Sequence, residues 1–353
     1  MPYLVKYSLK RIGLLIVTIF IILTLTFFLV KMLPEKAVTG VAETVFGFYS
    51  GEAVKGYYTI VDSVDESLGD YVYMYKATSS VSGSEFVRYI YKTPAIRQYF
   101  SWVKGIFTRW DWGTSEAIQL NCPAMDLIAS RLPATVLINV IALIISLPLG
   151  FIFGIVAALY KNTWLDNVIS TVVMVFISIP SFVIISFLIV WLGYNGNLPS
   201  QWPVGSSISV GEYASAMVIP VLSLCFGTVA LFTRYTRAEL TEVMSSEFLL
   251  LARTKGLTRS QSVIRHALRN SMVPIVPMII GQFISVLSGS VVLEQLYVIP
   301  GIGRLFVESI NYHDYNVLLV DMAFYTLIGL FANLLVDLSY GIVDPRIRMG
   351  ASS

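Results

Sequence analysis

Two carboxylates, Asp321 and Asp337, interrupt an apolar stretch from about residue 317 to 342. Charged groups are costly inside a membrane, so these side chains must face the protein interior, water or an interface. They belong to a series of residues at four-residue spacing: Asp321, Tyr325, Gly329, Asn333, Asp337 and Gly341. One interpretation is a proton relay. The interpretation that the positions favour is structural anchoring, because both acids lie near the ends of the stretch.

His313 and Asp314 form a second pair capable of acid–base chemistry. An intramembrane enzyme built on this pair, or on the carboxylates of the last span, is therefore the alternative from a different functional class. The sequence has no Gly-x-Ser-x-Gly, His-Glu-x-x-His or paired-aspartate motif to support it. It also has no Gly-x-x-x-x-Gly-Lys-Ser/Thr loop for ATP. We predict no catalytic residue, metal site or bound cofactor on this chain.

The composition indicates an integral membrane protein. Hydrophobic residues make up 56% of the 353 residues and charged residues 13%, and the mean hydropathy is +0.74, outside the range of soluble domains. The formal net charge of +2 says little, so the distribution of charge must be examined. Cys122 and Cys225 are the only cysteines, which excludes a disulfide framework. We predict that they do not bond to each other.

Apolar stretches predict an all-α integral membrane protein with six transmembrane helices. Their approximate bounds are 12–30, 134–159, 168–192, 214–232, 275–293 and 317–342. A signal peptide is the alternative for the first stretch, but that stretch is long for one. Lys and Arg concentrate at the N-terminus, between spans four and five, and in the tail, whereas the short loops after spans three and five hold only Arg304. This pattern places both termini in the cytoplasm.

Residues 34–130 form the one sizeable extramembrane insert, which this orientation places outside the cell. Alternating tyrosines at 71, 73 and 75 indicate a strand. Apolar and aromatic residues from Ile96 to Phe107 recur at helical spacing. That helix either lies in the membrane interface or packs inside a small folded cap. The predicted organisation is therefore a tail and first span at 1–33, the insert at 34–130, a membrane-spanning core at 131–343 and a cytoplasmic tail at 344–353.

Prolines and small residues predict where the spans bend and pack. Pro148 and Pro180 fall inside spans two and three and should kink them, with the freed carbonyls facing protein or water. Gly281, Ser285 and Gly289 recur every four residues in span five. Small residues at this spacing let two helix backbones approach closely, so we predict that they pack against another helix.

The loop at residues 234–273 combines basic charge with ordered helix signals. Ser246 is a predicted N-cap for a first helix that opens with Glu247. Gly256 is placed to end that helix in a left-handed conformation. Thr258 and Gln261 match a capping box for a second helix, which Pro274 should limit.

The second helix of the loop has a predicted basic side and an apolar side. Arg265 lies one turn from Arg269, as His266 does from Asn270. The apolar stripe consists of Val263, Ile264, Ala267 and Leu268. Three interpretations compete: a charge signal that orients the spans, a DNA-reading helix-turn-helix, and a docking element for a soluble partner. The flanking spans disfavour DNA, and the helix signals favour docking.

The loop resembles the coupling loop of ABC-importer permeases, and most closely that of the dipeptide/oligopeptide group. The likeness rests on Ala252-x-x-x-Gly256 followed by the run Arg265–Asn270 and Pro274. Leu250 stands where the wider family carries a Glu, so we expect an apolar contact there. Further stretches that look like peptide-permease signatures are Asp111–Ser115, Arg131–Thr135, Val292–Glu294, Ile299–Arg304, Asn333–Asp337 and Asp344–Arg348.

The resemblance implies a type I ABC-importer permease fold and a transport function for peptides. It implies a second homologous permease, two ATPase subunits that carry ATP and Mg²⁺, and an external solute-binding protein as partners, with the lipid bilayer as surroundings and no nucleic acid. The implied location is the cytoplasmic membrane of a prokaryote. The implied docking residues are Glu247, Leu250, Ala252, Gly256, Arg265, His266, Arg269 and Asn270. A permease for another solute, such as nickel or an oligosaccharide, is the alternative with the same architecture.

Overall fold

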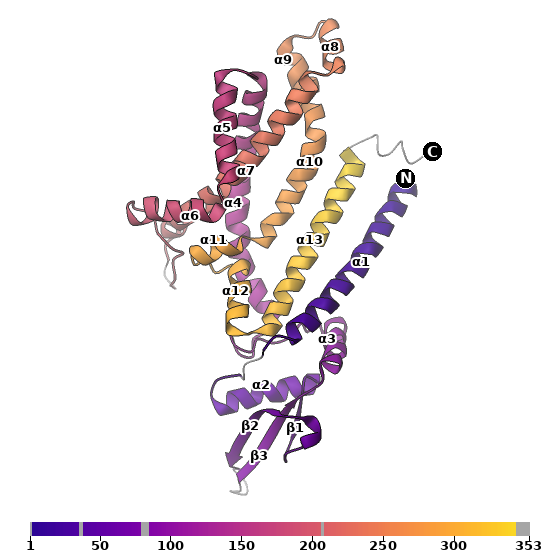
Figure 1. Cartoon of the computed structure of the whole chain (residues 1–353), viewed down its shortest axis with the longest axis vertical. Helices are drawn as coiled ribbons and strands as arrows, with labels where there is room; N and C mark the ends of the chain where they lie inside the picture. Colours follow the sequence, from indigo (N-terminus) through magenta and orange to yellow (C-terminus); the bar gives the residue numbers. More distant parts are fainter. Residues whose placement is uncertain (1, 35–37, 79–84, 206–207, 344–353) are drawn as a thin grey trace. The chain divides into compact units, whose positions relative to one another are not determined.

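The computed structural model describes residues 2–34, 38–78, 85–205 and 208–343 (Figure 1). The predicted tail at 344–353, with its share of the positive charge, lies outside the described residues.

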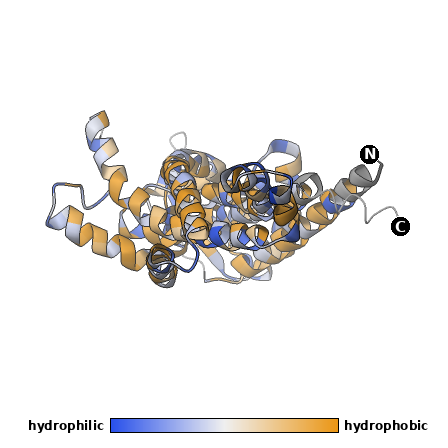
Figure 2. Ribbon diagram, turned by 90° about the horizontal axis from the view of Figure 1, so that it is seen from above, coloured by the Kyte–Doolittle hydropathy of each residue, from blue (hydrophilic) through white to orange (hydrophobic). Residues whose placement is uncertain are grey.

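Long apolar helices dominate the described chain, and Figure 2 shows hydrophobic residues along them. Five helical stretches are long and apolar enough to cross a membrane, or six if one bent pair counts as a span. The stretches are Leu9–Lys31, Ala124–Leu159, Val210–Met244, Ser260–Leu296 and Tyr315–Ser339, with Trp164–Ser178 and Ser181–Tyr194 as the bent pair. The predicted six-span organisation is thereby confirmed.

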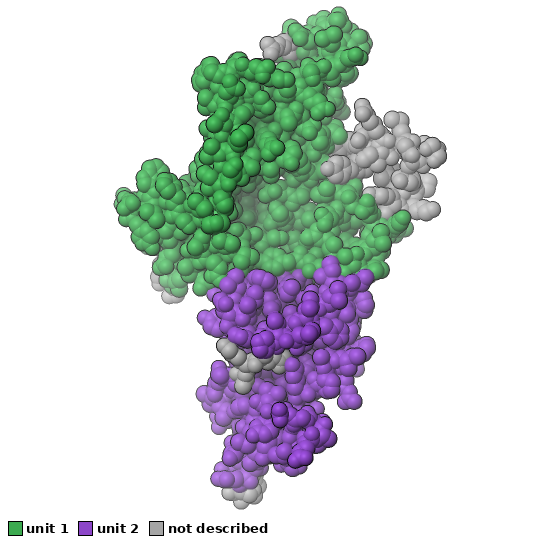
Figure 3. Space-filling view, in the orientation of Figure 1, with its two compact units in different colours: residues 1–18, 131–304, 325–353 green, residues 19–130, 305–324 purple. Residues whose placement is uncertain are grey.

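The chain divides into two compact units, coloured separately in Figure 3. Unit 1 comprises residues 1–18, 131–304 and 325–353, and unit 2 comprises residues 19–130 and 305–324. The boundary crosses four helices: α1 (Pro2–Lys31), α4 (Ala124–Leu159), α12 (Ile302–Tyr312) and α13 (Tyr315–Val343). Unit 2 is therefore larger than the predicted 34–130 insert, because helix ends on either side of the insert pack with it.

The insert in unit 2 contains a β-sheet, so the all-α prediction applies to the spans and is wrong for the insert. Its elements are α2 (Ala42–Lys55), β1 (Tyr58–Val61), η1 (Glu66–Leu68), β2 (Tyr71–Thr78), β3 (Glu85–Lys92) and α3 (Ala95–Arg109). The strands pair antiparallel in the order β1-β3-β2, with an irregularity between Tyr71 and Tyr73. The predicted strand at these tyrosines is confirmed. The sheet buries Ile90 against Phe48 and Tyr49 of α2.

The junction between α12 and α13 is tied to the insert through Asp314, which is fully buried. One of its carboxylate oxygens accepts the Ser115 hydroxyl at 2.5 Å and the backbone N–H groups of residues 116, 117 and 118 at 3.0–3.2 Å. Its other oxygen accepts the N–H of Val317 in the first turn of α13 at 3.4 Å. Asp314 is thus a helix cap and a structural anchor, and it is unavailable as the acid–base partner of His313.

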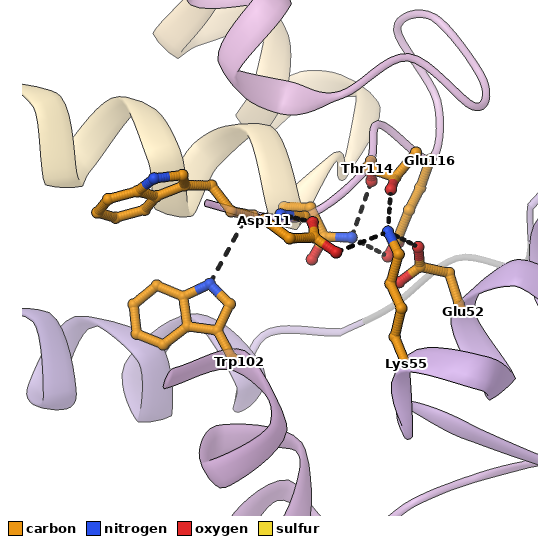
Figure 4. A network of polar contacts seen from close by, with 9 residues as sticks. Glu52, Lys55, Trp102, Asp111, Thr114 and Glu116 are labelled. Atoms are coloured by element: carbon orange, nitrogen blue, oxygen red, sulfur yellow. Dashed lines mark hydrogen bonds and ion pairs between the residues drawn. The ribbon is translucent and has the colours of Figure 1, made fainter. Parts of the chain in front are cut away.

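A network centred on Lys55 joins α2 to the segment that follows α3 (Figure 4). The Lys55 ammonium on α2 contacts Glu52 at 2.8 Å, Asp111 at 3.3 Å and the Thr114 hydroxyl at 2.7 Å. An ammonium has three N–H donors, so these three acceptors account for its hydrogen-bonding capacity. The segment that follows α3 is thereby fixed onto α2.

Unit 1 is a helical bundle in which α4 packs closely on α7 (Val210–Met244). A Cβ placed on Gly150 would lie 2.7 Å from Phe232 Cβ, and one on Gly154 would lie 2.5 Å from Thr236 Cβ. Only a residue without a side chain fits where the backbones of α4 and α7 come this close. These two glycines, four residues apart, form the close-packing pair of the bundle.

Span three is a broken helix. α5 (Trp164–Ser178) and α6 (Ser181–Leu188) meet at an angle of 96° around Ile179 and Pro180, and the π-helical segment η2 (Ile189–Tyr194) follows. The bend predicted at Pro180 is therefore present, and it is sharp enough to end one helix and begin another. The Ser223 hydroxyl of α7 donates to the Ser181 carbonyl at 3.2 Å, which ties the start of α6 to α7. At Pro148, by contrast, α4 remains one helix.

Candidate functional site

The predicted loop is a pair of short helices at one end of unit 1. α8 (Glu247–Thr254) follows α7, and α9 (Arg259–Ser262) leads through the π-helical segment η3 (Val263–Ala267) into α10 (Leu268–Ser285). The Ser246 hydroxyl donates to the Val243 carbonyl at 2.6 Å and makes no capping bond to α8. Ser246 thus occupies the predicted N-cap position of α8, but its side chain does not cap the helix, because the hydroxyl bonds back to the end of α7.

The reversal between α8 and α9 occurs at Gly256, whose φ is +95°. Its N–H donates to the Arg253 carbonyl at 3.0 Å, just after the last turn of α8. Nothing lies within 4 Å of a Cβ placed there, so the backbone conformation and not crowding requires glycine. α9 then begins with a reciprocal capping box: Gln261 N–H donates to Thr258 Oγ1 at 3.3 Å, and Thr258 N–H donates to Gln261 Oε1 at 3.2 Å.

The second helix does not end at Pro274, contrary to the prediction. It continues through Pro274 and Pro277 to Ser285. Prolines are tolerated in spanning helices where local π-helical segments, side chains or neighbours satisfy the freed carbonyls. η3 ends seven residues, about two turns, before Pro274. The π-turn also changes the helical period, so Ile264 is exposed while its neighbours in the predicted stripe, Val263 and Ala267, are buried.

A small apolar cluster fixes the helix pair to the ends of α4 and α7. Leu249, Val263 and Ala267 pack with Ala158 of α4 and Leu240 of α7. Ala252, a predicted docking residue, is only 8% exposed and belongs to the packed side of α8. A small residue there lets α8 lie close to the bundle. We therefore place Ala252 beneath the surface that a partner would contact.

The opposite side of the helix pair presents apolar side chains among cations. Leu250 is 66% exposed, and the other exposed apolar residues are Phe248, Leu251 and Ile264. The exposed polar and charged residues are Glu247, Arg253, Lys255, Arg265, Arg269 and Asn270. His266 is half-buried, and its ring meets Phe248 edge to face at 5.7 Å. We call this set, with Gly256, the docking surface, after the role that the sequence predicts for it. An apolar patch rimmed by charge is typical of a protein-binding surface.

Two neighbouring sequence signatures, Val292–Glu294 and Ile299–Arg304, meet the distant signature Arg131–Thr135 at Glu294, which is 2% exposed. Glu294 belongs to α11 (Val291–Leu296) and accepts the Thr135 hydroxyl of α4 at 2.9 Å. The Arg304 N–H donates to its other oxygen at 3.1 Å, and the Ile302 N–H donates to Thr135 Oγ1 at 3.0 Å. Cβ atoms on Gly289, Gly301 or Gly303 would collide with this group or with neighbouring backbone.

The family model for "Binding-protein-dependent transport system inner membrane component" matches residues 150–349, which include the docking surface and Glu294. The chain belongs to this family. It is 34% identical over 346 residues to the dipeptide transport system permease protein DppB of Lactococcus lactis, covering 98% of this chain and 100% of that protein. It is 30% identical to DppB of Bacillus subtilis, covering 98% of each. The recognition made from sequence motifs is confirmed.

Among solved structures, the chain is similar to the inward-facing MetNI methionine ABC transporter, at 16% identity and a TM-score of 0.49. The match covers 62% of this chain and 97% of that chain.

The predicted small-residue series in this permease is only partly formed. A Cβ on Gly281 of α10 would lie 3.3 Å from Val336 of α13, so this glycine does face another helix. Ser285 ends α10 and is exposed. Gly289 lies beyond the 3₁₀ turn η4 (Val286–Ser288), with a φ of +63°. The prediction of one continuous face is wrong because the helix ends before the third member.

The two carboxylates of the last span occupy different surroundings. Asp337 forms an ion pair with Arg11 of α1 at 2.9 Å, in a groove that Asn333 also lines. Asp321 is fully buried in unit 2. The two acids are 16 residues apart on α13, about 24 Å along the axis. Direct proton exchange between them is excluded at that separation, and for Asp337 the ion pair favours the structural interpretation.

An ion pair between Asp166 and Arg237 was missed by the sequence analysis. Asp166 in the first turn of α5 is 1% exposed and also accepts the Asn162 N–H at 2.9 Å. Arg237 on α7 donates to both of its oxygens. No local signal singles out this pair, because Arg237 is one of several charged residues near the end of α7, with Arg234, Glu239 and Glu242. No group of three or more His, Cys, Asp or Glu side chains that could hold a metal occurs in the part of the chain described by the structure.

Proposed function

We propose that this chain is the membrane-spanning permease subunit of an ABC importer, and that it forms the translocation path for dipeptides or oligopeptides delivered by an external binding protein. The observation that carries the proposal is similarity along nearly the whole chain to proteins named dipeptide transport system permeases. The chain is a transport subunit and not an enzyme.

In this proposal the docking surface binds an ATPase subunit at the cytoplasmic face. ATP and Mg²⁺ belong to two such partners, and a second homologous permease completes the membrane part. The support is geometric. The exposed side of α8 and η3 offers Leu250 and Ile264 as apolar contacts, and Arg265 and Arg269 as charged ones. The opposite side is packed onto α4 and α7, so displacement of the loop is passed directly to two spans.

The proposed location is the cytoplasmic membrane of a prokaryote, with both termini in the cytoplasm. ATP-driven closure of the ATPase subunits moves the docking surface, and the spans switch from an outward-open to an inward-open path. The break at Pro180 and the proline-containing helix α10 are the irregular elements next to α7 that accommodate such a change.

The test is uptake by the complete transporter reconstituted in vesicles with its binding protein. We expect Leu250→Asp and Ile264→Asp to reduce receptor-stimulated ATPase activity and peptide uptake at least about tenfold, because each places a charge in an apolar contact. Tyr160→Asp, at an exposed aromatic in the turn between α4 and α5, is the matched control. Normal coupling in both docking variants would contradict the assignment of the surface.

Substrate class is tested in the same vesicles. Labelled dipeptides and longer peptides should be taken up in an ATP-dependent manner and should compete with one another. Uptake of nickel or an oligosaccharide without peptide uptake would replace the peptide proposal while leaving the permease assignment intact.

A further inference from the structure

α3 in the insert has two apolar faces, and only one of them is covered in unit 2. Tyr99 and Trp102 are buried on the covered face. The other face consists of Ile96, Phe100, Val103, Phe107 and Trp110, at intervals of four, three, four and three residues. This spacing places the first four on one stripe of α3, and Trp110 follows at the C-cap, one residue beyond the helix. All but the half-buried Val103 are exposed, and Phe107 is 83% exposed. We call these five residues the α3 stripe.

The covered face packs on the membrane-spanning helix α1, within unit 2. The Tyr99 and Trp102 rings lie 5.4 Å and 5.1 Å from the Phe27 ring. The Tyr99 hydroxyl is 2.7 Å from Thr24 Oγ1. Because the Thr24 hydroxyl donates to the Phe20 carbonyl, Tyr99 is the donor in this bond. α3 is therefore attached to α1 inside the stretch that crosses the membrane.

The attachment point fixes the depth of α3. The apolar stretch of α1 ends at Lys31, so Thr24 and Phe27 lie about 10 Å and 6 Å before that end at 1.5 Å per residue. Helices that lie in a membrane interface bury their apolar face about 5–10 Å into the boundary between headgroups and acyl chains. The contacts with α1 thus place α3 at the depth of an interfacial helix.

The charges and aromatic rings around the stripe match that environment. Arg97 and Lys104 are exposed and seven residues apart, so they share one flank of α3. Long cationic side chains in this position extend toward lipid phosphates while their stems cover apolar surface. Trp110 ends the stripe at the C-cap and is exposed, as expected for a tryptophan at a membrane–water interface.

We propose that the α3 stripe is a lipid-binding surface, which inserts into the headgroup region of the leaflet where α1 ends and uses Arg97 and Lys104 to bind anionic headgroups. The insert is then held against the membrane at two places, through α1 and through the stripe. This surface is separate from the docking surface and does not depend on the substrate that the permease carries.

The experiment measures depth in the complete transporter in nanodiscs containing anionic lipid. A fluorescent label is attached at Phe107→Cys, in a chain that also carries Cys122→Ser and Cys225→Ser. The matched control is a label at Val64→Cys, which is exposed beside the sheet. Each is quenched in turn by a nitroxide on the lipid near the headgroup and by a water-soluble nitroxide. We expect the lipid nitroxide to quench position 107 at least about twofold more than position 64, with the opposite order for the aqueous quencher.

Two results would overturn the proposal. Strong quenching of position 107 by the water-soluble nitroxide would show that the α3 stripe is exposed to water and not inserted in the membrane. Protection from both quenchers in the complete transporter, but lipid quenching when the permease is alone, would show that another subunit covers it. The charge contribution is measured with Arg97→Gln/Lys104→Gln. The double variant should lose lipid quenching at position 107 in anionic membranes and match the parent in zwitterionic ones. Unchanged lipid quenching in anionic membranes would contradict the assignment of Arg97 and Lys104 to anionic headgroups.

Discussion

The Arg237 guanidinium donates two hydrogen bonds to the Asp166 carboxylate, from Nε to Oδ1 at 2.5 Å and from Nη2 to Oδ2 at 2.8 Å. This bidentate pair joins α5 to α7, the helix that leads directly into the docking surface. Planar, two-point pairing of this kind fixes orientation as well as distance. The turn between α4 and α5 is therefore held to the same helix that the proposed ATPase partner would move.

Asp166→Asn should destabilise the permease by about 1.5–3 kcal/mol, as expected for loss of hydrogen bonds to a charged group. The effect is smaller than the roughly 3–5 kcal/mol for breaking a fully buried pair, because the Arg237 side chain is 32% exposed. The measurement is the midpoint of thermal inactivation of the purified complex. The exchange of the two residues, Asp166→Arg with Arg237→Asp, should recover part of the loss, and a double variant worse than both singles would argue against a pairwise interaction.

Gly154→Ala should destabilise the bundle by about 1–3 kcal/mol, because the added methyl overpacks a close helix contact. The matched control is Gly227→Ala on α7, where nothing lies within 4 Å of the added Cβ. Since alanine is the better helix former, the control should be neutral or slightly stabilising. Equal thermal midpoints for the two variants would show that α4 and α7 do not approach as described.

Gly256→Val tests the reversal in the docking surface. A β-branched residue at a φ of +95° is strained, and the left-handed region costs an ordinary residue about 1–2 kcal/mol. We expect the complex to reach the membrane and bind loaded receptor, while ATP hydrolysis no longer responds to the receptor. Gly256→Asn, which tolerates this conformation better, should keep most of the response. Charge reversal at Arg265 or Arg269 should also weaken coupling without loss of assembly.

Thr135→Val should destabilise the Glu294 site by about 1–3 kcal/mol, because it leaves a buried carboxylate oxygen and the Ile302 N–H without their shared partner. Thr135→Ser keeps the hydroxyl and is the control, with an expected loss well below that of valine. Thermal midpoints of the two variants provide the comparison. A valine variant as stable as the serine variant would mean that shape, and not the hydrogen bonds, holds this site together.

Cys122 provides a pH-dependent test of topology. Burial, together with the nearby Asp126 carboxylate, raises the pKa of the Cys122 thiol. At neutral pH its thiolate fraction is therefore lower than that of an ordinary cysteine, and the thiolate is the reactive form. Labelling by an impermeant maleimide should be slow at pH 7 and accelerate as the pH rises toward that pKa. If the maleimide labels Cys122 only after the membrane is permeabilised, the insert lies on the cytoplasmic side.

Local signals in the sequence predicted the spans, the strand at Tyr71–Tyr75, the glycine reversal and the capping box, because each depends on a few neighbouring residues. The errors occur where tertiary contacts or helix irregularities decide. A π-turn rotates Ile264 out of its predicted stripe, and the 3₁₀ turn after α10 removes Gly289 from its helix face. Spacing alone also selected Gly281 and Gly289, whereas the close approach of α4 to α7 at Gly150 and Gly154 was not predicted. Asp166 and Arg237 are 71 residues apart, so their pairing leaves no local pattern.

The anchoring of residues 115–118 by Asp314 has a consequence for biosynthesis. The Ser115–Asp314 bond joins residues 199 apart in the sequence. At a translation rate of about 5–20 residues per second, Asp314 is made roughly 10–40 s after Ser115. During that interval the backbone N–H groups of residues 116–118 have no carboxylate to bind, although the sheet and α2 are already complete. A ribosome-bound chain ending before residue 314 should consequently be cut by protease in this segment, and the finished chain should resist.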